Sequence, residues 1–205
     1  MWIILSAIIL LVAFGVYNNP DRKNRIDPEL EVLLIESQET REFVTTEIQN
    51  NKICFEDNEL EVDKTIIGNC IKGIQKVIDK LHSEREIVIK LENYRTNKGE
   101  SLSSETKLIV ENSLKLNNSK EYQNLINSTV EYFKAHIEYY VFLRDELGNR
   151  SLDDLSENQV ANLISISDRT EETGKVLQSQ RPMFNDYLKQ NYNQEFIDLL
   201  NLTNK

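Results

Sequence analysis

The chain has 205 residues and a formal net charge of −10 at pH 7, with 34 acidic and 24 basic side chains. An acidic surface repels phosphate groups, so this composition argues against binding to nucleic acid and against non-specific binding to anionic lipid. Only 6 Gly and 3 Pro occur. This scarcity of turn-forming residues argues against many short strands and predicts a few long helices.

Residues 2–17 read WIILSAIILLVAFGVY and contain no charged side chain. As a helix this stretch would be about 25 Å long, close to the thickness of the hydrocarbon core of a bilayer. Trp2 and Tyr17 stand at its two ends, and aromatic rings favour the headgroup region. The stretch therefore predicts a single-pass membrane anchor at 1–17, followed by a short polar tether at 18–26.

A cleaved signal peptide is the other interpretation of this stretch. Ala13-Phe14-Gly15 supplies the small residues that a cleavage site needs. However, no Lys or Arg precedes the apolar run, and the run exceeds the usual length of the apolar region of a signal peptide. The retained anchor is therefore favoured, and cleavage stays open.

Two features of the sequence indicate opposite sides of the membrane for the remaining chain. Arg22, Lys23 and Arg25 closely follow the apolar stretch, and such basic residues favour the cytoplasmic side. Cys54 and Cys70 could instead form a disulfide if the domain is exported. The basic residues slightly favour a cytoplasmic domain. In the cytoplasm the two thiols should stay reduced, so this orientation predicts two free thiols. The extracytoplasmic alternative stays open.

Residues 27–205 suffice for one acidic domain, and their pattern predicts an all-α antiparallel bundle of four to six helices. Asp27-Pro28-Glu29 begins the first helix, because Asp caps it and Pro suits the first helical position. This helix should extend to about residue 50, with an apolar face made of Leu30, Leu34, Val44 and Ile48. Ser37 and Arg41 interrupt that face, which is typical of a helix at the edge of a bundle.

The connection at 51–62 is acidic but lacks the ligand spacing and the central Gly of a calcium-binding loop. A second helix is predicted at 63–96 and should end near Gly99 in a left-handed conformation. Its apolar residues recur at spacings of three and four, and only Arg85 interrupts them. The seam consists of Ile67, Ile71, Ile74, Ile78, Leu81, Val88 and Leu91.

Ser103 or Ser104 should cap a third helix with Leu108, Ile109, Leu114 and Leu116 inward. Asn118 and Glu121 form a plausible capping pair for the next segment. Whether 104–147 is one helix or two stays open. The segment at 122–147 is the most apolar of the domain, so we expect it to be the central helix.

Ser151 and Asp154 should open a further helix by a capping box, and Pro182 marks a kink or a new start. The side chains expected inward in the first of these segments are Leu155, Leu163, Ile166 and Val176. Those expected inward in the last helix are Phe184, Tyr187, Leu188, Phe196, Leu199 and Leu200.

The sequence contains little that could support catalysis, a metal or a cofactor. His82 and His136 are the two histidines, and neither lies in the Glu-x-x-His pattern of di-iron bundles. His136 falls on an apolar seam and predicts a hydrogen-bonded core imidazole, whereas His82 should be exposed. No Cys-x-x-Cys pair, nucleophile elbow, P-loop or dinucleotide fingerprint occurs. We therefore expect no enzyme, catalytic residue, metal site or cofactor.

The sequence favours a membrane-anchored module that binds another protein, and a basic partner would complement its charge. A small-ligand-sensing bundle is the alternative, because the aromatic cluster of Tyr132, Tyr139 and Tyr140 beside Phe133 and Phe142 could line a pocket. Ordinary core packing explains that cluster more simply, so a small-molecule ligand is disfavoured. The identity of the partner and the oligomeric state cannot be derived from the sequence.

Overall fold

The computed structural model describes residues 27–50, 54, 64–148 and 151–192. This part of the chain is helical throughout, without strands, and confirms the predicted all-α bundle. The anchor predicted at 1–17 and the tether predicted at 18–26 lie outside the described residues. The elements are α3 (Pro28–Asn50), α4 (Lys64–Lys98), α5 (Ser104–Asn117), α6 (Lys120–Phe142), η2 (Leu143–Leu147), η3 (Leu152–Asp154) and α7 (Glu157–Asn191).

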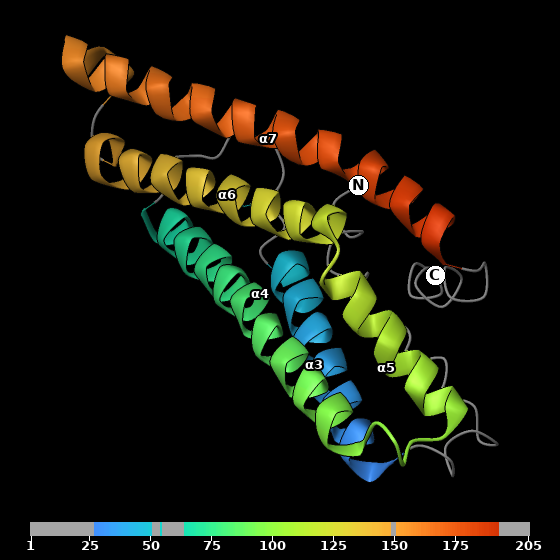
Figure 1. The fold of residues 1–205 in the computed structure, drawn as a ribbon. Coiled ribbons are helices and arrows are strands. Elements are labelled where there is room, and N and C mark those ends of the chain that lie inside the picture. Colours follow the sequence, from blue (N-terminus) through green and yellow to red (C-terminus); the bar gives the residue numbers. More distant parts are fainter. Residues whose placement is uncertain (1–26, 51–53, 55–63, 149–150, 193–205) are drawn as a thin grey trace.

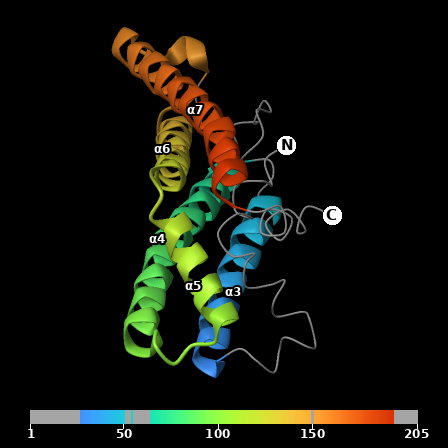
Figure 2. The ribbon, with the colours of Figure 1, turned by 45° about the vertical axis from the view of Figure 1, so that its right-hand side comes forward.

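Helix α4 packs against α3, α5 and α6. Helix α3 lies antiparallel to it, and α5 runs beside its second half (Figure 1). Helix α6 crosses the first half of α4, and α7 lies antiparallel along the far side of α6. The turned view keeps α6 between α7 and α4 (Figure 2). The expected central position of α6 is therefore confirmed, but α4 connects both halves of the bundle.

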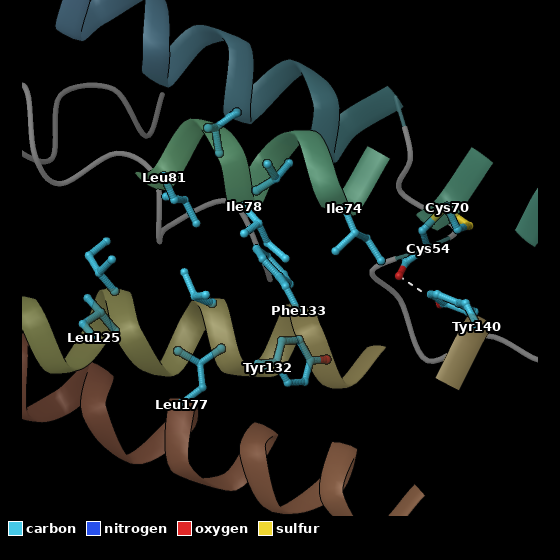
Figure 3. Packing of buried hydrophobic residues seen from close by; sticks show 14 of the residues in the cluster. Cys54, Cys70, Ile74, Ile78, Leu81, Leu125, Tyr132, Phe133, Tyr140 and Leu177 are labelled. Carbon is cyan, nitrogen blue, oxygen red and sulfur yellow. Dashed lines mark hydrogen bonds between the residues drawn. A yellow bond between two sulfur atoms is a disulfide. The ribbon is translucent and has the colours of Figure 1, made fainter. Parts of the chain in front are cut away.

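The core consists of two apolar clusters that meet along α4. The larger cluster joins the first half of α4 to α6 and α7, and Ile74, Phe133 and Leu177 belong to it. Figure 3 shows Phe133 pointing from α6 toward α4, and Leu177 pointing from α7 toward α6. The smaller cluster joins the second half of α4 to α3 and α5. Its buried members are Leu30, Leu33, Ile87, Leu91, Tyr94, Val110 and Leu114.

The caps explain where the shorter helices begin. Asp27 accepts a hydrogen bond from the backbone N–H of Glu29 at 2.9 Å, so α3 begins at Pro28 as predicted. Ser103 caps α5 through the N–H of Thr106 at 3.2 Å. The region after it forms two helices, but the cap of the second is Ser119 and not Asn118. The Ser119 hydroxyl accepts from the N–H of Tyr122 at 3.2 Å.

The helical boundaries around α7 differ from the prediction. Ser151 and Asp154 do form a capping box, but it opens only the short 3-10 turn η3. A second capping box, Ser156 with Gln159, opens α7. That helix continues through Pro182, so the new start predicted there is wrong. Leu177 and Phe184 pack on the same side of α7 before and after the proline, and this packing outweighs the one lost hydrogen bond.

Some expected core and turn positions are wrong for local reasons. Leu108 is 59% exposed and Val176 is 45% exposed, because each lies on the far side of its helix from the buried residues. Gly99 does not adopt the expected left-handed conformation, since no described glycine has a positive φ. Its N–H instead donates to the carbonyl of Arg95 at 2.8 Å, which continues the helical pattern.

Candidate functional site

The aromatic cluster on α6 is held by contacts among its own side chains. The ring of His136 lies 4.2 Å from that of Tyr132 and 6.2 Å from that of Tyr140, measured between centroids. His136 Nδ1 lies 3.1 Å from the carbonyl oxygen of Tyr132. Because a carbonyl can only accept, Nδ1 is the protonated nitrogen. His136 is thus the buried, hydrogen-bonded imidazole that the sequence predicts.

Helix α7 closes over this cluster at a glycine. A Cβ placed on Gly174 would lie 3.3 Å from Cε2 of Tyr132. Tyr132, Tyr140, Phe133 and Phe142 are all buried, whereas Tyr139 is half-buried. Ring contacts and the approach of α7 account for this burial, as expected for ordinary core packing.

A buried carboxylate that the sequence did not reveal lies between α4 and α6. Glu84 is only 6% exposed, and its Oε2 accepts a hydrogen bond from the Tyr122 hydroxyl at 3.4 Å. Burial, and then the charge of Glu84 and this hydrogen bond, raise the pKa of Tyr122 well above its ordinary value. The expected interruption, Arg85, is exposed instead. The spacing of Leu81, Glu84 and Val88 was the available signal for this inward carboxylate.

The two cysteines form a disulfide, so the prediction of two free thiols is wrong. Cys54 lies in the connection between α3 and α4 and is bonded to Cys70, with their Cα atoms 5.3 Å apart. Tyr140 of α6 donates a hydrogen bond to the carbonyl of Cys54 at 3.0 Å (Figure 3). Both cysteines are buried in the larger core cluster. The connection is therefore fixed to both α4 and α6 at this point.

Helix α7 buries far fewer residues than α4, although the two helices have the same length. Each helix has 35 residues, but α7 buries only Leu177, Phe184 and Leu188, whereas eleven residues of α4 are buried. Between 157 and 176 no residue of α7 is fully buried. This first part of α7 rests on α6 along one half-buried side and presents the rest of its circumference to solvent.

The exposed side of this part of α7 combines apolar and acidic residues. Glu157, Val160, Ile164, Asp168 and Glu171 recur at spacings of three and four, so they share one side of the helix. Val160 is 39% exposed and Ile164 is 56% exposed. We call these five residues the outer face of α7. They form the candidate interaction surface.

The charge around the outer face is strongly acidic. Residues 151–172 contain six acidic residues and one basic residue, Arg169. Arg169 points to the other helix, because its guanidinium bonds Glu138 of α6 at 2.6 Å. Glu171 pairs with Lys175 on the same helix, and this hydrogen bond and charge lower the pKa of Glu171. Glu157 and Asp168 are exposed carboxylates on the outer face.

Few residues in the described part of the chain could form another kind of site. His82 is exposed, as predicted. No group of three or more His, Cys, Asp or Glu side chains among the described residues could hold a metal ion. Within the same residues, no helix has the length and hydropathy needed to cross a bilayer. Comparisons with protein-family models, curated proteins and solved structures found no match.

Proposed function

We propose that this chain is a membrane-anchored helical domain that binds another protein through the outer face of α7. The observation that carries the proposal is the incomplete attachment of α7, whose first twenty residues contain no fully buried side chain. Three large apolar side chains are exposed on that part of the helix, at positions 160, 164 and 176, and the first two belong to the outer face. Contiguous exposed apolar residues with a polar rim mark protein-binding surfaces, and Val160 and Ile164 are neighbours on one side of the helix with acidic residues before and after them.

The proposed anchor is the uncharged stretch at 2–17, which is long enough to cross a hydrocarbon core as a helix. Helix α3 begins at Pro28, so the intervening tether is short. Such a tether would hold the domain near the membrane surface. A protein partner of this domain would therefore be a membrane protein or a protein recruited to that surface.

We also propose that the domain faces an oxidising compartment and not the cytoplasm. Disulfides persist outside the cytoplasm, where thiol reductants do not remove them. The Cys54–Cys70 disulfide supports export of the domain. The basic residues Arg22, Lys23 and Arg25 favour the opposite orientation. We give the disulfide more weight, because it depends on a specific pair of buried side chains in the fold.

Crosslinking in native membranes tests the proposed function. Membranes that contain the full-length chain are treated with a cleavable amine-reactive crosslinker, and the products are identified by mass spectrometry. We expect a discrete product with a second protein. The same product should form when residues 2–17 are replaced by an unrelated membrane span, because the helical domain makes the contact. Products with the anchor alone, or no protein product, would contradict the proposal.

A further inference from the structure

We infer that the partner presents a cationic amphipathic helix that docks lengthwise on the outer face of α7. This inference rests on the proposed function and names the chemistry of its partner. Three observations carry it: the spacing of the exposed residues, the local excess of acidic charge and the incomplete burial of this part of α7.

The spacing of the outer face fits a second helix. From Glu157 to Glu171 the face follows a pattern of three and four residues, which is the pattern that packs against another helix. These residues span about 21 Å at 1.5 Å per residue, or about four helical turns. Val160 and Ile164 are neighbours on successive turns in the first half of the face. They would contact the apolar side of a docked helix.

The charge of this region complements a basic partner. Arg169 is already bound to Glu138 and lies 3.8 Å from Glu131, both on α6. It therefore cannot neutralise the carboxylates of the outer face. A helix with Lys or Arg on either side of its apolar stripe would pair with Glu157 and Asp168 while its stripe covered Ile164.

The other acidic helix, α3, is a weaker candidate because lysines of α4 already pair with three of its carboxylates. Glu36 pairs with Lys90 of α4 at 2.5 Å, and Glu47 pairs with Lys76 of α4 at 3.3 Å. Glu29 pairs with a third lysine of α4 at 2.7 Å. A cationic helix on α3 would have to displace these lysines. On the outer face of α7, Glu171 pairs with Lys175 of the same helix, whereas Glu157 and Asp168 form no ion pair with the described residues of any other helix.

A photo-crosslinking amino acid at position 164 tests this surface in the full-length chain and in native membranes. The matched control carries the same amino acid at position 89, because Ile89 of α4 is exposed to the same degree, 57% against 56%. We expect a protein product from position 164 and not from position 89. Mapping of the crosslinked peptide should give a helical segment rich in Lys or Arg with an apolar stripe. A product with lipid, with a second copy of this chain, or with an acidic or neutral segment would overturn the inference.

Charge reversal tests the ionic contribution. Asp168→Lys should lower the yield of the product from position 164 at least about tenfold, which corresponds to about 1.4 kcal/mol. Glu86→Lys, at an exposed position of α4, should leave the yield unchanged. Circular dichroism checks that both variants are folded. An unchanged yield for Asp168→Lys would overturn the inference.

The two proposals fail differently. If amine-reactive crosslinking still captures a partner while position 164 captures none, the docking surface is wrong and the proposed function stands. If neither method captures a protein, both are wrong.

Discussion

Gly174 of α7 lies against the aromatic ring of Tyr132 of α6, with no side chain between the backbone of one helix and the ring of the other. A Cβ at position 174 would lie 3.3 Å from Cε2 and 3.7 Å from Cδ2 of that ring. Tyr132 has little freedom to move, because the ring of His136 lies 4.2 Å away, tilted by 56°, and that of Phe133 lies 5.9 Å away. This glycine therefore sets how closely α7 approaches α6.

Replacing each of two helical glycines by alanine distinguishes the effect of this contact on stability from the effect of helix propensity. An Ala inside a helix is more stable than Gly by about 1 kcal/mol. Gly68→Ala should raise the free energy of unfolding by this amount, because a Cβ at position 68 meets nothing within 4 Å. Gly174→Ala should gain clearly less or become destabilising, since Tyr132 must shift. Urea denaturation of both variants measures the difference, and equal gains would contradict the contact.

Phe133→Ala should lower the free energy of unfolding by about 3 to 5 kcal/mol, as truncation of a buried Phe commonly does. Phe133 is 5% exposed and belongs to the larger core cluster between α4 and α6. Phe43→Ala is the control, because Phe43 is 38% exposed on α3 and should cost much less. Thermal melts by circular dichroism compare the two. Equal losses would mean that the core does not lie where the structure places it.

The helices and most core positions could be predicted from the sequence because local signals determine them. The caps at Asp27 and Ser103, and the apolar periodicity of α4 and α6, gave bounds within about two residues of those observed, as is usual for helix ends. The sequence indicated that a helix ends near Asn117, but it did not indicate whether Asn118 or Ser119 caps the next helix. Both residue types cap helices well, and only the backbone geometry decides between them.

The candidate surface could not be predicted, because it depends on how α7 lies on α6. Leu163 and Ile166 are half-buried, as predicted, but Val176, which was predicted inward with them, is exposed. Periodicity alone therefore did not settle which side of this mostly polar helix faces the bundle. The positions of Gly174 and Leu177 decide this in the structure. The disulfide raises a similar difficulty. The sequence allowed Cys54 and Cys70 to pair, but their meeting depends on where Cys54 lies against α4 and α6.

Removal of the disulfide should destabilise the domain by about 3 kcal/mol, the value expected for a closed loop of this length. The two cysteines are separated by 16 positions. The double variant Cys54→Ala/Cys70→Ala and the reduced wild-type protein should show the same loss in urea denaturation. A wild-type protein whose stability does not respond to reductant would contradict this prediction.

Tyr140→Phe isolates the second contact of the same connection. The variant removes only the hydroxyl that bonds the Cys54 carbonyl at 3.0 Å. We expect a loss of about 1 to 3 kcal/mol, the cost of leaving a buried carbonyl without that donor. Tyr139→Phe, at a half-buried position of the same helix, serves as the control. Equal effects of the two variants would show that this hydrogen bond contributes nothing specific.

The fold should lose stability at alkaline pH through Tyr122. Its folded pKa is raised, chiefly by burial and then by Glu84, above the ordinary value of 10.0. The stabilisation is therefore fully present below pH 10 and is lost as the pH rises toward the folded pKa. Tyr122→Phe should weaken the pH dependence of urea denaturation above pH 10. An identical dependence in the variant and the wild type would contradict the buried position of this hydroxyl.

Alkaline carbonate extraction tests the proposed anchor. Full-length protein should stay in the membrane pellet, because residues 2–17 form an uncharged stretch of spanning length. A truncated chain that begins at Asn19 should be released into the supernatant. Release of the full-length protein, or a mature N-terminus near residue 16, would show that the stretch does not anchor the protein.

The most direct test of the account is a count of thiols in protein trapped from cells. Cells are quenched with acid, and the denatured full-length protein is alkylated with a mass-shifting maleimide before and after reduction. A domain displayed in an oxidising compartment, with Cys54 bonded to Cys70, should show no reactive thiol before reduction and two after it. Two reactive thiols before reduction would contradict the disulfide and the exported orientation together.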